Sequence, residues 1–170
     1  YEQQQMGTVD EMLSTVIKES FKAIKKANKI ERKPAPLSSL RIGLECGASD
    51  GFSGISSNPT LGVVSDLLVA LRGTAVLSEF PELCGVEQEL VNRCVQNEDA
   101  EKFLLLMNAF EKSVVDAGSG FDMNPSPGNI KDGLITDAMK SAGAAKKGGT
   151  SPVEAVLDYG EYIADIFGYG

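Results

Sequence analysis

The chain has 170 residues, of which 42% are apolar, and its 24 acidic and 16 basic residues give a formal net charge of −8. This apolar content suffices for one globular core, whereas the acidic balance disfavours binding to nucleic acid. No apolar run of about 18 residues and no signal sequence is visible, so we expect a cytoplasmic protein that does not enter a membrane.

The side-chain inventory limits the chemistry that this sequence can perform. It contains no histidine, which is the commonest general base and metal ligand, and three cysteines. An odd number of irregularly spaced cysteines indicates reduced thiols rather than a disulfide framework. Any chemistry here must therefore use carboxylates, thiolates, hydroxyls, lysines or backbone groups.

The first predicted element is an amphipathic helix that starts after residue 8. Thr8 and Glu11 form a capping box, and apolar residues then recur at helical spacing to about residue 27. Seven basic residues follow one another closely between positions 18 and 33, and we interpret them as a solvated face. Two prolines then break the pattern, so residues 1–36 are predicted as a helix with a linker and residues 37–170 as an α/β core.

A strand, a helix and a second strand are predicted next. Apolar residues alternate over residues 40–45, and a second short strand is predicted over Thr74–Ser78. Between them, Asn58 as N-cap and Gly73 as terminator bracket an apolar helix. This order predicts a crossover unit, and hence an α/β fold with three layers, a mostly parallel sheet and crossover helices.

The rest of the core is predicted to be mainly helical. Helical spacing covers about residues 86–95 and 99–115, and a shorter helix is expected around 134–142. Ser151 and Glu154 match a capping box and predict a last helix start.

Polar side chains gather where the two predicted strands end. Glu45 and Glu79 close the strands, and parallel strands place these ends at the edge where open α/β sheets bind ligands. The loop after the first strand adds four short polar side chains on a glycine-rich backbone: Cys46, Ser49, Asp50 and Ser53. A thiolate with carboxylates suits Fe(II), Zn(II) or Mn(II), so this loop is a candidate metal site, with an ordinary structural turn as the alternative.

A second unusual loop is rigid. Residues 124–129 contain two prolines and a glycine between two asparagines, which suits either a binding loop or a simple connector between helices. Cys84 and Cys94 are interpreted as structural, because an unligated cysteine is usually a small buried hydrophobe.

Five segments in one order and spacing then give the chain a family resemblance. They are Gly43–Ile55, Asn58-Pro59, Leu77–Glu79 with Pro81-Glu82, Asn124–Asn129 and Gly148–Pro152. Together they resemble the altronate/galactarate dehydratase family over roughly residues 37–163. The large subunit of sulfolactate sulfo-lyase resembles the same pattern. Ala48 departs from it where the family usually has glycine, and Cys84 where an aromatic residue is common.

The resemblance implies a hydro-lyase that removes water from a hexonate or hexarate, such as altronate or galactarate, to give a 2-keto-3-deoxy acid. It implies a divalent metal, Fe(II) or Mn(II), held by Cys46, Asp50 and Glu79, with Glu79 and Asp50 also as catalytic residues. Four polar residues are implied to bind substrate: Ser49, Ser53, Asn58 and Asn129.

The expected partners are the sugar acid, further domains of the same enzyme and, as an open option, a second copy of the chain. Because members of the family carry further domains, we expect the 170-residue chain alone to be inactive or nearly so. Two alternatives stay open, namely a non-catalytic α/β module that binds organic anions and a sulfo-lyase of the same family.

Overall fold

The computed structural model describes residues 1–47 and 49–162, which divide into a unit of residues 1–35 and a second unit from Pro36 onward. The first unit holds a short 3-10 turn, η1 (Gln3–Gln5), and the long helix α1 (Val9–Ala27). The predicted capping box is confirmed, since Thr8 Oγ1 accepts from Glu11 N at 3.3 Å and Glu11 Oε2 accepts from Thr8 N at 2.8 Å. No helix among the described residues combines the length and apolarity needed to cross a lipid bilayer.

The second unit is built on two parallel strands, β1 (Arg41–Leu44) and β2 (Thr74–Leu77), which pair from Arg41 with Thr74 to Leu44 with Leu77. A 3-10 turn, η2 (Leu37–Ser39), leads into β1, and α2 (Ser57–Ala70) connects the two strands. The predicted strand, helix and strand are therefore confirmed, and the unit is α/β. The described sheet has these two strands, so a three-layer arrangement stays a prediction.

The ends of α2 differ from the prediction. The N-cap is Ser56, whereas Asn58 is buried inside the helix, and its side-chain amide donates to Gly143 O at 3.0 Å. The N-cap role of Asn58 was therefore wrong, because a long-range acceptor captures the amide. At the other end, Arg72 takes the left-handed conformation with φ 68°, and Gly73 N donates back to Leu68 O at 2.8 Å.

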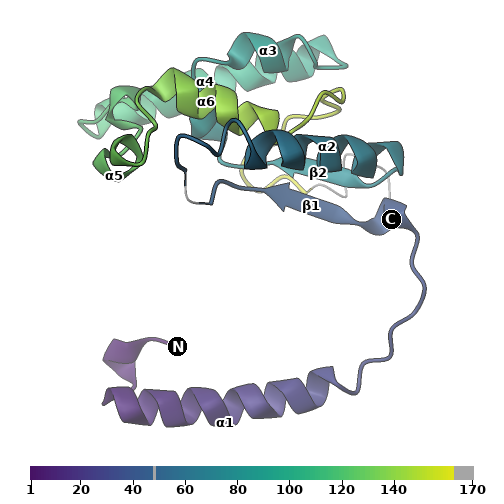
Figure 1. Cartoon of the computed structure of the whole chain (residues 1–170), viewed down its shortest axis with the longest axis vertical. Helices are drawn as coiled ribbons and strands as arrows, with labels where there is room; N and C mark the ends of the chain where they lie inside the picture. The colour runs from purple at the N-terminus through teal and green to yellow at the C-terminus, as the bar shows by residue number, and fades with distance from the viewer. Residues whose placement is uncertain (48, 163–170) are drawn as a thin grey trace. The chain divides into compact units, whose positions relative to one another are not determined.

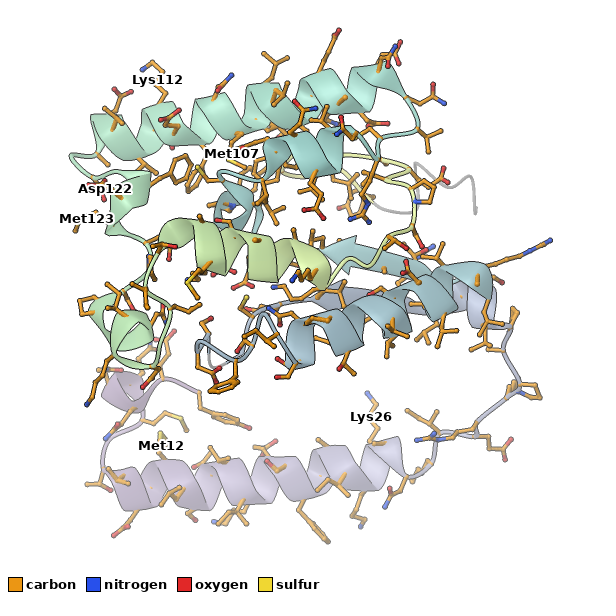
Figure 2. The ribbon with its side chains drawn as sticks, turned by 45° about the horizontal axis from the view of Figure 1, so that its top comes forward. Met12, Lys26, Met107, Lys112, Asp122 and Met123 are labelled. Atoms are coloured by element: carbon orange, nitrogen blue, oxygen red, sulfur yellow. The ribbon has the colours of Figure 1, made fainter. Side chains whose placement is uncertain are left out.

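Helices and short 3-10 turns follow β2 as far as Lys146. These elements are η3 (Phe80–Leu83), α3 (Glu87–Val91), α4 (Asn97–Asp116), η4 (Phe121–Met123), α5 (Pro127–Lys131) and α6 (Asp137–Lys146). Figure 1 shows α6 between α2 and the α3–α4 pair. In Figure 2, Met107 points from α4 into the core, where it is 4% exposed, while Lys112 points outward. The core also contains Leu83, Leu90 and Phe103.

A helix start at Ser151 was predicted, and this prediction was wrong. Ser151 Oγ donates to Asp66 Oδ1 at 2.6 Å instead of capping a helix, and Arg93 Nη2 donates to Ser151 O at 2.7 Å. Val153 then forms an isolated bridge with Cys94. The segment is extended because Asp66 and Arg93, which are distant in sequence, form hydrogen bonds with Ser151 and Val153 that a first helical turn would otherwise need.

Two glycines let α6 lie very close to its neighbours. A Cβ on Gly62 of α2 would lie 2.3 Å from Lys146 O, and a Cβ on Gly143 of α6 would lie 3.0 Å from Gly54 Cα. The backbones themselves are therefore in contact at both places. This contact holds the end of α6 against the loop that follows β1.

We predict that Gly62→Ala lowers the free energy of unfolding by about 1–3 kcal/mol, because the added methyl overlaps a main-chain carbonyl that cannot move alone. Helix propensity alone would favour alanine by about 1 kcal/mol, so the sign separates the two effects. Urea unfolding measures the change. Gly47→Ala is the matched control, since its Cβ would meet no atom within 4 Å. Equal stability of the two variants would contradict the prediction.

Candidate functional site

Three potential metal-ligand side chains meet where the strands end. Cys46 lies two residues beyond β1, Glu79 lies two residues beyond β2, and Glu82 lies in η3. One ligand atom from each lies within 4.8 Å of those of the other two. We call these three residues the ligand cluster. Cys46 and Glu79 were predicted from the sequence as metal ligands. The third predicted ligand was Asp50, and Glu82 was not predicted.

The local backbone explains how Glu82 joins Glu79. Residues three apart in a 3-10 turn lie on one face, and Glu82 N donates to Glu79 O at 2.8 Å. Glu79 itself takes the left-handed conformation with φ 58° and ψ 50°, which costs a residue other than glycine about 1–3 kcal/mol. The Pro81-Glu82 pair was visible in the sequence, but nothing in its pattern assigned it a ligand role.

A buried lysine lies against the cluster. Lys147, at the end of α6, is 0% exposed, and its Nζ donates to Cys46 Sγ at 3.0 Å and to Glu79 Oε2 at 3.2 Å. Glu79 Oε2 also accepts from the backbone N–H of Cys46. These contacts compensate the strained backbone of Glu79 and link α6 to the ends of both strands. The sequence gave no signal for Lys147, since a lysine at a helix end is usually solvated.

These contacts move the pKa values of the three groups in directions that follow from their surroundings. Burial raises the pKa of Cys46, and the nearby Glu82 carboxylate adds to this effect. Burial also acts to raise the pKa of Glu79, but the hydrogen bonds from Cys46 N–H and from Lys147 outweigh it and lower the pKa. Burial opposes the charge of Lys147, yet its bonds to Cys46 and Glu79 raise its pKa. Glu79 and Lys147 therefore form an ion pair around neutral pH.

A second lysine of α6 faces Glu82. Lys140 Nζ lies 2.9 Å from Glu82 Oε1, and the two side chains are 10% and 15% exposed. The same ammonium donates to Asn124 Oδ1 at 2.8 Å and, more distantly, to Asn129 Oδ1 at 3.5 Å. The other oxygen of the carboxylate, Glu82 Oε2, is buried without a hydrogen-bond partner among the described residues. An orphaned carboxylate oxygen is an available ligand atom for a cation.

The other residues predicted from sequence lie close by but are engaged elsewhere. Asp50 Oδ1 accepts from the backbone N–H groups of Phe52 and Ser53 at 2.7 and 2.9 Å, and Asp50 lies outside the ligand cluster. Asn129 forms a capping box with Ser126 at the start of α5. Ala48 lies outside the described residues.

One small cavity gathers most of these predicted residues. It has a volume of about 10 Å³, room for about one water-sized oxygen atom, and lies between the loop after β1 and α6. Lys140 lines this cavity together with five residues that were predicted from the sequence: Cys46, Ser49, Asp50, Ser53 and Asn58. A larger cavity of about 320 Å³ lies between β2 and residues 151–157, and its lining is mainly apolar.

Comparison with known proteins gives consistent similarities. The family model described as "D-galactarate/Altronate dehydratase, C-terminal" matches residues 37–169. "Altronate dehydratase" of Bacillus subtilis (strain 168) is 46% identical over 133 residues, which are 78% of this chain and 27% of the relative. "Galactarate dehydratase (L-threo-forming)" of Escherichia coli (strain K12) is 33% identical over 150 residues, 88% of this chain and 29% of the relative.

A further relative carries a different name. The "(2R)-sulfolactate sulfo-lyase subunit beta" of Chromohalobacter salexigens is 32% identical over 155 residues, 87% of this chain and 40% of the relative. The chain thus spans between 27% and 40% of the length of these three relatives.

We predict that Lys147→Met lowers the free energy of unfolding by about 3 kcal/mol, because it leaves the Glu79 carboxylate without its buried partner. Lys146→Met is the control, since Lys146 is the exposed neighbour on the same helix and its loss should cost no more than about 0.5 kcal/mol. Thermal and urea unfolding of both variants measure the difference. Similar losses in the two would show that the buried ammonium does not stabilise the strand ends.

Proposed function

The chain belongs to the D-galactarate/altronate dehydratase family, and we propose that it supplies a metal-binding part of the active site of a sugar-acid dehydratase. The observation that carries this proposal is the ligand cluster of Cys46, Glu79 and Glu82 at the carboxyl ends of β1 and β2. Substrates proposed for the complete protein are hexonates or hexarates of the altronate and galactarate type. Its reaction would expel water and leave a 2-keto-3-deoxy acid.

The donor set fits the Fe(II) or Mn(II) that we propose as the cofactor. A thiolate with two carboxylates suits a first-row transition metal, whereas Mg²⁺ and Ca²⁺ prefer oxygen alone. The orphaned Glu82 Oε2 is a buried oxygen that a cation would satisfy. Cys46, Glu79 and Glu82 would hold the ion, and a bound ion would supply Lewis acidity toward the departing hydroxyl and the substrate carboxylate.

The chain's own residues would do the remaining work. Lys147 Nζ holds Cys46 Sγ and Glu79 Oε2 in place through hydrogen bonds from a fully buried position. Asp50 lies on the adjoining loop and, in this proposal, accepts the proton from the carbon next to the substrate carboxylate. Ser49 and Ser53 line the neighbouring cavity and would donate to substrate oxygens, as proposed from the sequence.

We predict that the 170-residue chain binds Co²⁺ with a thiolate-to-metal charge-transfer band, which reports the sulfur ligand directly. Cys46→Ala should remove the band, and Glu79→Gln and Glu82→Gln should each weaken binding about tenfold or more. Absorption titrations measure both effects.

Two controls sharpen this test. Cys94→Ala should leave the band unchanged, because that thiol is not in the ligand cluster. Asp50→Asn should also bind Co²⁺ normally; a loss of binding there would restore Asp50 as a ligand and remove Glu82. An unchanged band in Cys46→Ala would end the proposed ligand set.

The substrate class is tested in the full-length protein that carries these residues. We expect 2-keto-3-deoxy acid to form from altronate or galactarate, and turnover to fall at least a hundredfold in Cys46→Ala, since a ligand loss removes the Lewis acid. The relative named as a sulfo-lyase favours one competing function, expulsion of sulfite from sulfolactate. Release of sulfite with no keto-deoxy product would replace the dehydratase proposal by that alternative.

A further inference from the structure

We propose that Lys140 receives the carboxylate of the sugar acid, and that it binds this carboxylate more tightly once a divalent cation occupies the ligand cluster. This inference rests on the function proposed above and names a substrate-binding residue for the same site, together with its dependence on the cation. Two lysines contact the cluster: Lys140 in α6 and Lys147 directly after this helix.

The two lysines differ in what can reach them. Lys147 is fully buried, and its Nζ is held between Cys46 and Glu79. Lys140 is 10% exposed and lines the small cavity beside the loop after β1. Among the described residues, Lys140 is the one cation that lines this cavity. An anion that enters this cavity would therefore contact Lys140.

The surroundings of Lys140 suit one carboxylate oxygen. The cavity has room for about one water-sized atom, and the hydroxyl-bearing Ser49 and Ser53 also line it. Asp50 lines it too, but its Oδ1 is turned to the backbone N–H groups of its own loop. The rest of a sugar acid would lie outside, over the exposed side of the loop.

Charge explains why a bound cation would strengthen the binding of the carboxylate. In the structure Lys140 is paired with Glu82 and Lys147 with Glu79, so the two ammonium groups and the two carboxylates balance. A divalent cation would add two positive charges to this balanced site. Because Glu82 would then share its charge with the cation, Lys140 is left with a weaker partner and attracts an anion more strongly.

The two asparagines beside Lys140 give this exchange a structural basis. Lys140 Nζ donates to Asn124 Oδ1 and, at 3.5 Å, to Asn129 Oδ1; Asn124 precedes α5 and Asn129 lies in its first turn, both within the segment 124–129. These neutral acceptors hold the ammonium in place without neutralising it. The sequence singled out this loop as a candidate binding loop, and its contact with Lys140 gives it a definite part in the site.

The experiment measures galactarate binding to the full-length protein by calorimetry, with and without saturating Mn²⁺. In the wild type, Mn²⁺ should tighten galactarate binding at least about tenfold, the size expected for one charge-assisted hydrogen bond. Lys140→Gln should bind Mn²⁺ within about threefold of the wild type and lose this enhancement. Lys146→Gln, which changes an exposed lysine of the same helix that does not line the cavity, should behave as the wild type does.

The outcomes distinguish the role of Lys140 from that of the metal site. If Lys140→Gln keeps the enhancement, or if it loses Mn²⁺ binding together with it, Lys140 is not the carboxylate receptor. Should Lys140→Gln fail to fold, Lys140→Arg replaces it, and a retained charge must retain at least part of the enhancement. If the wild type binds no Mn²⁺, the proposed metal site itself fails; Mn²⁺ binding without any effect on galactarate overturns this inference alone.

Discussion

The buried ammonium group of Lys147 is the contact on which the arrangement of this site depends. It joins the end of α6 to Cys46 after β1 and to Glu79 after β2, across sequence separations of 101 and 68 residues. A charge without exposure to water persists only where its partners are close and correctly placed. Glu79 has a left-handed backbone conformation, and in this conformation its carboxylate accepts hydrogen bonds from both Lys147 and the N–H of Cys46.

The position of Lys147 depends in turn on how closely helices can approach. Gly62 lets α2 touch the carbonyl of Lys146, and Ser65 Oγ donates to Lys147 O at 2.8 Å. Beyond the lysine, Asp66 accepts from the N–H and hydroxyl groups of Thr150 and Ser151. One side of α2 thus holds the turn from residue 146 to residue 151. The geometry of the site therefore depends on the stability of this packing.

Two lysines and three potential ligands in such a small volume also shape the proposed chemistry. The paired charges keep the cluster nearly neutral without a cation, which limits the cost of burying it. A cation would then turn the site positive and suit it to an acidic substrate. In the proposed function, such a cation would both activate the departing hydroxyl and prepare the anion site.

Local signals in the sequence were sufficient to predict several elements. The capping box at Thr8, the strands that end before Cys46 and before Glu79, and the polar loop between β1 and α2 could all be predicted, because each depends on neighbouring residues. The ordered motifs also determined the family. Long-range packing brings Glu82 beside Cys46 and Glu79, with Asp50 outside this cluster, and places Lys140 and Lys147 against it. The reason is physical: a 3-10 turn and a close helix contact bring these side chains together from distant segments, and no local pattern encodes which polar group finds a partner there.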